Sequence, residues 1–253
     1  MTDSPEFHAD RIRVNGYTIF EDLLPRALID SLRDAFDRQL SEHMRREPSN
    51  RGANRYQMYL PFEPPFADPR VYENDTVLAV VEAVFGNAAF AANPEAVTSI
   101  CTYFASDTPL PGSDYQRVHS DTQLLFPENR LSLPAYGLVL NIPLVDVTEE
   151  NGPMEIWPGG THLWPGGSDI AALAQEMPSR RVTMNAGSVL LRDLRMWHRG
   201  TPNHSDRSRP NIALVYTRPW YRFEQKVPVI PRAAWHEISD RARKLFRHAV
   251  LTD

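Results

Sequence analysis

The chain has 253 residues, with 27 Lys and Arg against 32 Asp and Glu, and 42% of its residues are hydrophobic. This length can bury a sizeable core, and the composition is that of a globular protein rather than a disordered or fibrous one. A formal net charge of −5 argues against a nucleic-acid-binding protein, which usually carries a basic face. The single cysteine, Cys101, excludes an intramolecular disulfide and a cysteine-cluster metal site, and we expect a reducing, cytoplasmic location.

The N-terminal third, about residues 1–95, has the pattern of helices. It contains no apolar stretch typical of a secretory signal, and nowhere in the chain is an apolar run long enough to predict a membrane span. Hydrophobic residues recur at helical spacing over 24–44, and a second helical run over 76–85 follows Asn74, which can cap it. Residues 50–72, rich in Pro, Arg and aromatic side chains, predict an ordered segment without regular structure.

The remainder of the chain changes to a strand pattern. Short segments rich in β-branched and aromatic residues are separated by turn signals such as Asn151-Gly152. Many short strands separated by turns are typical of a sandwich or jelly-roll barrel. We therefore predict one α+β, mainly β, domain over residues 1–253, with a barrel core over about 96–222 and a final helix over about 231–250. The predicted strands are 97–104, 136–147, 154–157, 181–184, 187–193 and 211–217.

Histidines two residues before an aspartate are candidate metal ligands, because alternate side chains of a strand share one face. Two histidines and a carboxylate on one side of a metal leave other positions open, as in non-haem Fe(II) oxygenases. The chain has three such pairs, His8/Asp10, His119/Asp121 and His204/Asp206. We expect the first pair to be solvated surface in a polar tail, and the last lies in a polar turn, which holds ligands poorly. The middle pair opens an alternating stretch that predicts a strand entering the barrel.

The other histidine ligand must come from a distant part of the chain. His198 follows the predicted strand 187–193 and precedes a turn, although a lone histidine there is more often a packed core residue. Arg209 lies eleven residues later, at the start of the next strand. On an adjacent antiparallel strand it would point into the same barrel as His198. Its planar guanidinium suits the binding of a carboxylate through two parallel hydrogen bonds in a dry pocket.

The order of these motifs resembles the phytanoyl-CoA dioxygenase family. The resemblance is carried by His119-Ser120-Asp121, the segment 150–162, Trp197-His198 and Arg209. Residues 15–36 also resemble the opening strand and helix of that family, so the similarity covers about residues 10–222. The family contains Fe(II)- and 2-oxoglutarate-dependent oxygenases. The resemblance therefore implies a double-stranded β-helix, a jelly-roll or cupin-like barrel, buttressed by N-terminal and C-terminal helices.

The resemblance also implies roles for single residues. The implied iron ligands are His119, Asp121 and His198. The implied contacts of 2-oxoglutarate are Arg209, which would anchor the distal carboxylate, together with Gln116, Asn141 and Thr201. Some relatives carry Trp at the position of Asn141, and many use Ser near that of Thr201. His162 lies in the Pro-Gly-x-x-His turn of the family and is interpreted as structural.

These assignments predict an oxygenase that uses Fe(II), 2-oxoglutarate and O2. We expect hydroxylation of an unactivated C–H bond, with release of succinate and CO2, because Asp121 is the carboxylate that halogenating relatives lack. The same machinery could instead desaturate, cyclise or epimerise its substrate. A non-catalytic cupin-like metal-binding protein is an alternative of another class, but it would have no reason for Arg209 or Gln116.

The substrate is expected to be a small or medium organic molecule, with no nucleic-acid or membrane partner. The mild acidity and the scarcity of Lys do not suggest a groove for the phosphates of an acyl-CoA. Side chains expected over the barrel mouth are Arg51, Arg55, Tyr56, Met58, Leu124 and Phe126. Aromatic residues that could line a pocket, although such residues are more often core, are Trp157, Trp220 and Tyr221.

Overall fold

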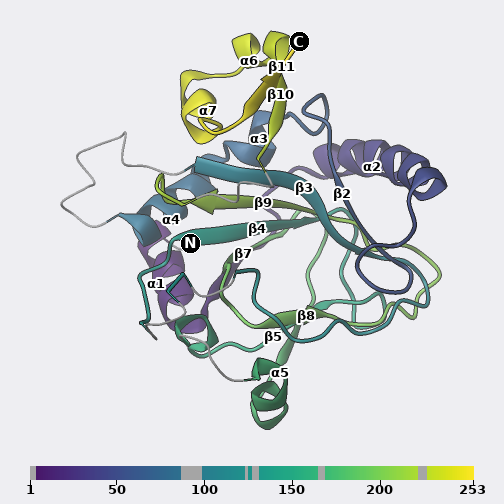
Figure 1. Cartoon of the computed structure of the whole chain (residues 1–253), viewed down its shortest axis with the longest axis vertical. Helices are drawn as coiled ribbons and strands as arrows, with labels where there is room; N and C mark the ends of the chain where they lie inside the picture. The colour runs from purple at the N-terminus through teal and green to yellow at the C-terminus, as the bar shows by residue number, and fades with distance from the viewer. Residues whose placement is uncertain (1–3, 87–98, 123–124, 127–130, 165–168, 222–226) are drawn as a thin grey trace.

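Two antiparallel sheets and a set of helices make up the computed structural model (Figure 1), which describes residues 4–86, 99–122, 125–126, 131–164, 169–221 and 227–253. The larger sheet has the order β1-β7-β4-β9-β3-β2, and the smaller has the order β6-β5-β8. Strands of the larger sheet are β1 (Tyr17–Phe20), β2 (Arg55–Tyr59), β3 (Ser99–Pro109), β4 (Gly137–Pro143), β7 (Val189–Asp193) and β9 (Asn211–Thr217). Strands of the smaller sheet are β5 (Met154–Ile156), β6 (Arg180–Val182) and β8 (His198–Gly200).

Helices of the N-terminal and C-terminal parts cover the outer face of the larger sheet and share one hydrophobic core with it, whereas α5 lies beside the smaller sheet and packs in another cluster. The helices are α1 (Pro5–Asn15), α2 (Arg26–Arg46), α3 (Pro69–Tyr72), α4 (Asp75–Phe85), α5 (Ile170–Leu173), α6 (Arg232–Glu237) and α7 (Asp240–Leu245). Two short 3-10 helices, Thr161–Leu163 and Ala174–Glu176, and a parallel strand pair, β10 (Val229–Pro231) and β11 (Val250–Thr252), complete the elements.

The central strands are buried on both faces, which explains their nearly continuous apolar sequence. In β4, Leu138 and Leu140 belong to the core under the helices. Val139 and Asn141 alternate with them and line a cavity on the opposite face. Because β4 pairs with both β7 and β9, the cavity-facing positions of the three strands lie side by side. Charged or polar residues at those positions are therefore brought to one site.

Each predicted strand of the central and C-terminal parts is present, with boundaries that shift by a few residues. The N-terminal part, however, is not only helical, because β1 and β2 join the larger sheet at its two edges. The prediction that residues 50–72 lack regular structure is wrong, since they contain β2 and α3. Strand β2 forms by pairing with β3, which is 40 or more residues away, so local sequence gave little sign of it.

The C-terminal part also departs from the prediction of one helix over 231–250. The chain there forms α6 and α7, separated at Ile238, whose backbone is extended, and at Ser239. The Ser239 hydroxyl accepts a hydrogen bond from the Ala242 backbone N–H at 2.9 Å and so begins a new helix. Figure 1 shows this C-terminal unit, in yellow, beside the edge of the larger sheet near β3.

The expected solvated N-terminal tail is helix α1, and His8 is not a surface residue. Its side chain is 7% exposed and makes a 2.7 Å hydrogen bond with the Thr18 hydroxyl. The imidazole also packs against the Phe20 ring, at 4.4 Å between ring centroids. Asp10 points to solvent instead and forms an ion pair with Arg13. The two residues therefore diverge, and they do not form a ligand pair.

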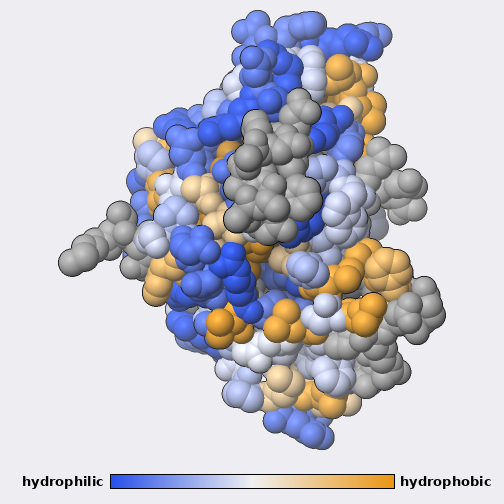
Figure 2. Space-filling model, turned by 90° about the vertical axis from the view of Figure 1, so that its left-hand side faces the viewer, coloured by the Kyte–Doolittle hydropathy of each residue, from blue (hydrophilic) through white to orange (hydrophobic). Residues whose placement is uncertain are grey.

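The described helices include none that is long and apolar enough to cross a membrane. On the face of the molecule drawn in Figure 2, hydrophobic patches are scattered among hydrophilic side chains. Such scattered apolar surface is normal for a folded protein.

Helix α4 provides a test of how far local sequence stabilises the fold. The Asn74 side chain accepts hydrogen bonds from the backbone N–H groups of Thr76 and Val77. Asn74→Ala is expected to lower the free energy of unfolding by about 1 kcal/mol, because it removes this cap. Urea denaturation measures the change. Asn74→Asp should retain most of the stability, and Glu82→Ala on the exposed side of α4 should have little effect; equal losses in all three would contradict the capping role.

Candidate metal and cosubstrate site

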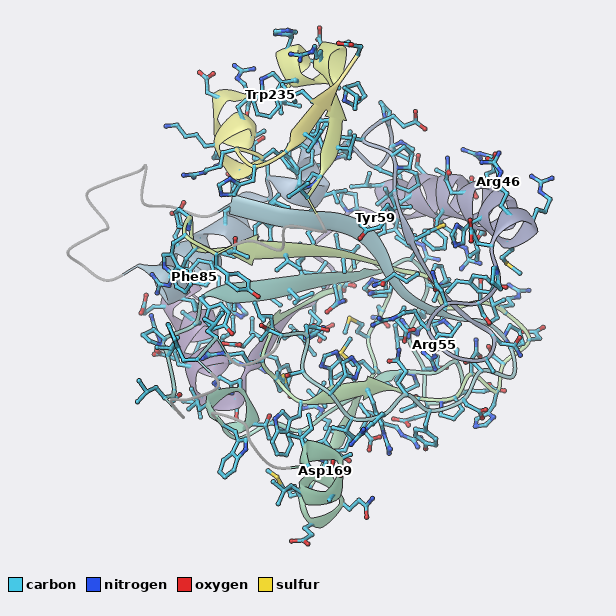
Figure 3. The ribbon with its side chains drawn as sticks, viewed as in Figure 1. Arg46, Arg55, Tyr59, Phe85, Asp169 and Trp235 are labelled. Carbon is cyan, nitrogen blue, oxygen red and sulfur yellow. The ribbon has the colours of Figure 1, made fainter. Side chains whose placement is uncertain are left out.

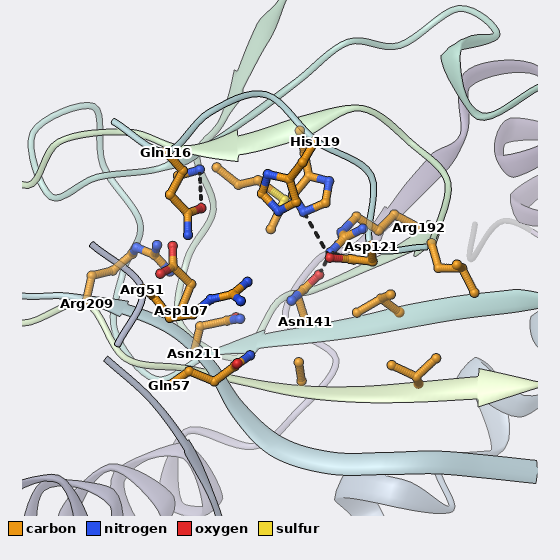
Figure 4. A pocket seen from close by; sticks show the side chains of 17 residues that line it. Arg51, Gln57, Asp107, Gln116, His119, Asp121, Asn141, Arg192, Arg209 and Asn211 are labelled. Atoms are coloured by element: carbon orange, nitrogen blue, oxygen red, sulfur yellow. Dashed lines mark hydrogen bonds and ion pairs between the residues drawn. The ribbon is translucent and has the colours of Figure 1, made fainter. Parts of the chain in front are cut away.

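His119, Asp121 and His198 converge at one end of the cavity between the two sheets (Figure 4). One ligand atom from each lies within 4.8 Å of the other two. Asp121 Oδ1 and His198 Nε2 are 3.5 Å apart. This separation is less than twice a metal–ligand bond length of about 2.1 Å, so both atoms could bind one ion. The three side chains can therefore share one metal ion.

The backbone fixes this arrangement without a regular strand. His119 and His198 form a reciprocal pair of backbone hydrogen bonds, 3.0 Å and 2.9 Å long, as an isolated antiparallel bridge. The Asp121 N–H donates to the Leu194 carbonyl at 3.0 Å. The predicted strand entering the barrel at His119 is not formed in the described part of 115–126, where His119 alone makes a β-bridge. The first two ligands are nevertheless tied directly to the segment that carries the third.

The two histidines present their Nε2 atoms to the site. Nδ1 of His119 lies 2.8 Å from the Arg117 carbonyl oxygen, and Nδ1 of His198 lies 2.9 Å from that of Met196. Because a carbonyl only accepts, each Nδ1 carries the proton and leaves the Nε2 lone pair for a metal. Burial, assisted by the nearby Arg192 charge, lowers the pKa of His198 to about 4, so its imidazole is neutral at neutral pH.

Arg192, which the sequence analysis missed, binds Asp121 directly. Its Nη2 donates to Asp121 Oδ2 at 2.7 Å, and its Nε donates to Asn141 Oδ1 at 3.2 Å. Burial alone would raise the pKa of Asp121, but the charge of Arg192 holds it well below its usual range. The carboxylate therefore stays ionised. One signal was available, since Arg192 is a charged residue that directly follows the apolar run Val189–Leu191 of β7 and faces the cavity.

Arg209 lies at the opposite, polar end of the cavity (Figure 4). Its Nε donates to the Gly152 carbonyl at 2.8 Å, which orients the guanidinium. Burial lowers its pKa to about 10, so the group remains a cation at neutral pH. Arg209 precedes β9 of the larger sheet, whereas His198 begins β8 of the smaller one. The expectation of adjacent strands is wrong, and the two side chains share a cavity because their sheets face each other.

Two of the three other predicted cosubstrate contacts lie in the cavity. Gln116 and Asn141 line the cavity, whereas Thr201 is not among its lining residues. The Thr201 hydroxyl donates to the Pro153 carbonyl at 2.7 Å, inside the protein. The Gln116 side-chain oxygen accepts from the Gly200 N–H at 2.8 Å, which leaves its amide nitrogen for other contacts. The structure thus brings Gln116 and Asn141, but not Thr201, to the same space as Arg209.

Asp107 is a second carboxylate at the polar end, which the sequence analysis did not single out. It forms an ion pair with Arg55, whose side chain is only 1% exposed and points into the molecule (Figure 3). Arg55 also donates to the Thr201 carbonyl at 2.8 Å. Burial raises the pKa of Asp107, against the opposing charges of Arg55, Arg209 and Arg51. This pair neutralises most of the local charge and leaves Arg209 as the buried cation next to it.

Three of the six side chains expected over the barrel mouth, those of Arg55, Tyr56 and Met58, have other positions. Arg51 lines the cavity, but Arg55 is in the buried pair with Asp107, and Met58 belongs to the core. Leu124 lies outside the described residues. Tyr56 is partly buried against the core, and Phe126 is 48% exposed.

The aromatic residues that were expected to line a pocket have three different environments. Trp220 is 62% exposed. Trp157 is buried and donates its indole N–H to the Ala174 carbonyl. Tyr221 lies beside Tyr136, and its hydroxyl is 3.1 Å from that of Thr122.

The remaining histidine candidates lie away from the three converging ligands. His162 is buried, and its Nε2 lies 3.1 Å from the Arg13 carbonyl oxygen of α1, a contact typical of a structural residue. His204 and Asp206 are exposed on a loop. Among the described residues, only His119, Asp121 and His198 form a group of three that could hold a metal ion.

The residues present fit an iron ion and a carboxylate-bearing cosubstrate. Two imidazoles and one carboxylate form the ligand set of non-haem iron oxygenases, and Arg209 supplies a buried cation in the same cavity. Two buried donors next to Asp121, Asn141 Nδ2 and Arg192 Nη1, have no hydrogen-bond partner within the described part of the chain. Because buried donors are normally paired, these two mark a polar position that a bound ligand would complete.

The chain is similar to known proteins in both sequence and structure. A family model described as Phytanoyl-CoA dioxygenase (PhyH) matches residues 12–211, which confirms the resemblance drawn from the sequence. AviO1 from Streptomyces viridochromogenes Tue57 is similar in structure, with a TM-score of 0.65 and 20% identity, over 87% of this chain and 97% of that chain. The epimerase SnoN, in complex with Fe3+, alpha ketoglutarate and nogalamycin RO, gives a TM-score of 0.62 and 20% identity over 87% and 86%. EctD from S. alaskensis, with 2-oxoglutarate and 5-hydroxyectoine, gives 0.62 and 19% over 88% and 80%.

Proposed function

Because the chain belongs to the phytanoyl-CoA dioxygenase family, whose chemistry is that of iron- and 2-oxoglutarate-dependent oxygenases, we propose that it hydroxylates an unactivated C–H bond of a small or medium organic substrate. The single observation that carries the proposal is the cavity shared by His119, Asp121, His198 and Arg209. A metal-binding protein without catalysis would need the first three but not the buried arginine.

The chain's own residues bind and orient the reactants. His119 Nε2, His198 Nε2 and Asp121 would hold Fe(II), which when bound supplies the oxidising chemistry that converts 2-oxoglutarate and O2 to succinate and CO2. Arg209 would bind the distal carboxylate of 2-oxoglutarate through two parallel hydrogen bonds. Gln116 and Asn141 would add amide contacts along the same molecule. Protein walls on both faces exclude water, which strengthens these charged contacts.

Two finer points of the proposal concern fold and residue roles. We infer that the facing six-stranded and three-stranded sheets are the two halves of a double-stranded β-helix, supported by the structural similarity to AviO1. Thr201 is left out of the cosubstrate contacts, because its hydroxyl is engaged by Pro153.

Anaerobic titration tests the proposal. Adding Fe(II) and then 2-oxoglutarate to the apoprotein is expected to produce a visible charge-transfer band, because the keto oxygen and its neighbouring carboxylate would both bind the metal. Glutarate, which has the same two carboxylates but no keto oxygen, is the matched control and should give no band. On admission of O2, slow release of succinate should follow. Metal binding without either signal would favour the non-catalytic alternative.

The reaction outcome is decided by product analysis. Compounds that accelerate succinate release identify candidate substrates. Hydroxylation adds one oxygen atom to the product mass, desaturation and cyclisation remove two hydrogen atoms, and epimerisation leaves the mass unchanged. The similarity to the epimerase SnoN makes the last outcome a specific alternative. Asp121 favours hydroxylation over halogenation, since a halide would need the position that the carboxylate fills.

A further inference from the structure

Arg192 is the one cation that touches a metal-ligand side chain among the described residues. It lies on β7 opposite Val139 of β4 and faces the cavity, with 3% of its surface exposed. Its guanidinium is held at two points, by Asp121 Oδ2 at 2.7 Å and by Asn141 Oδ1 at 3.2 Å. Because two acceptors hold it, the guanidinium has one defined orientation toward Asp121, whose side chain is 30% exposed.

The contact leaves only one oxygen of Asp121 for a metal. Oδ2 is bound by Arg192, while Oδ1 faces His198 Nε2 at 3.5 Å. Carboxylates bind metals through either one or both oxygens. If both oxygens of Asp121 bound the ion, the protein would fill four positions of an octahedral ion, and only two would remain. A cosubstrate that chelates through two atoms, together with O2, needs three.

Arg192 is also placed where it should weaken metal binding. A guanidinium next to a dication is repelled by it, and water screens this repulsion little at Arg192, whose side chain is 4% exposed. A residue that served only to stabilise the metal would not carry this charge. The charge of Arg192 is better explained if it holds the Asp121 carboxylate in one orientation.

We propose that Arg192 is a positioning residue that keeps Asp121 bound to iron through Oδ1 alone and so reserves coordination positions for 2-oxoglutarate and O2. The inference rests on the proposed function. Removal of Arg192 should weaken the binding of 2-oxoglutarate without weakening the binding of the metal. A merely structural role would lower both together.

The test compares Arg192→Met with Arg195→Met as a matched control. Arg195 forms another largely buried ion pair, with Asp193 at 2.7 Å, but its partner is not a candidate metal ligand. Titration with Mn(II) alone measures metal affinity. Anaerobic titration of the Fe(II) protein with 2-oxoglutarate measures cosubstrate binding through the charge-transfer band. Thermal melts of the apoproteins report the loss of stability common to both variants.

In Arg192→Met, the Kd for Mn(II) is expected to be equal to or lower than that of the unaltered protein, because a repelling charge is removed. The Kd for 2-oxoglutarate is expected to rise by about 10-fold or more. Arg192→Lys keeps a donor for Oδ2 and should recover part of the 2-oxoglutarate affinity. Two results would overturn the inference. One is a loss of Mn(II) affinity in proportion to the loss of melting temperature, as in Arg195→Met. The other is an unchanged Kd for 2-oxoglutarate. Absence of the band from the unaltered protein would instead overturn the proposed function.

Discussion

Replacement of His119 or Asp121 by alanine is expected to abolish iron binding and to reduce succinate formation by about 1000-fold or more, because each variant removes one of three metal ligands. Both side chains lie at the end of the cavity where the ligand atoms converge. Iron content after anaerobic loading and oxygen-dependent succinate release are the two measurements. The protein should remain folded, because the backbone bridge between His119 and His198 does not depend on either side chain.

The matched control for this experiment is the exposed pair elsewhere in the chain. His204→Ala and Asp206→Ala change the same residue types in another His-x-Asp sequence, but on a loop away from the cavity. Both variants are expected to keep the iron content and turnover of the unaltered protein. Undiminished turnover in His119→Ala or Asp121→Ala would remove the basis for the metal site.

Replacement of Arg209 by alanine is expected to raise the KM for 2-oxoglutarate by roughly 30- to 700-fold, equivalent to about 2–4 kcal/mol, because a buried charge-assisted contact is lost. Fe(II) binding should be nearly unchanged, since Arg209 lies at the opposite end of the cavity from the metal ligands. Succinate release at varied 2-oxoglutarate concentration provides the KM, and Mn(II) titration provides the metal affinity.

Two further variants separate the roles of charge and geometry at this position. Arg209→Lys retains the charge without the planar fork and should have an intermediate KM. Arg207→Ala removes an arginine two residues away whose side chain is 85% exposed, and it should behave as the unaltered protein. A KM for 2-oxoglutarate that is the same in Arg209→Ala and Arg207→Ala would contradict the anchoring role.

Much of the secondary structure could be read from the chain because it depends on local patterns. The cap at Asn74, the helical spacing in α2 and the short apolar runs of β4, β7 and β9 each signal an element from within a few residues. Elements that depend on distant partners were missed or misjudged. Strand β2 exists through its pairing with β3. His119 is held by an isolated β-bridge to His198 rather than by a strand.

The candidate site was likewise predictable in part: its residue types could be read from the sequence, but several of its contacts could not. The types and order of the side chains, from His119 and Asp121 to His198 and Arg209, are written in the sequence and are specific enough to indicate the family. Periodicity also assigns each strand residue to one of two faces. It does not say which strands face each other, and so it could not place Arg192 against Asp121 or turn Thr201 toward Pro153. Those contacts depend on two sheets closing over one cavity, which brings together residues 48 to 71 positions apart.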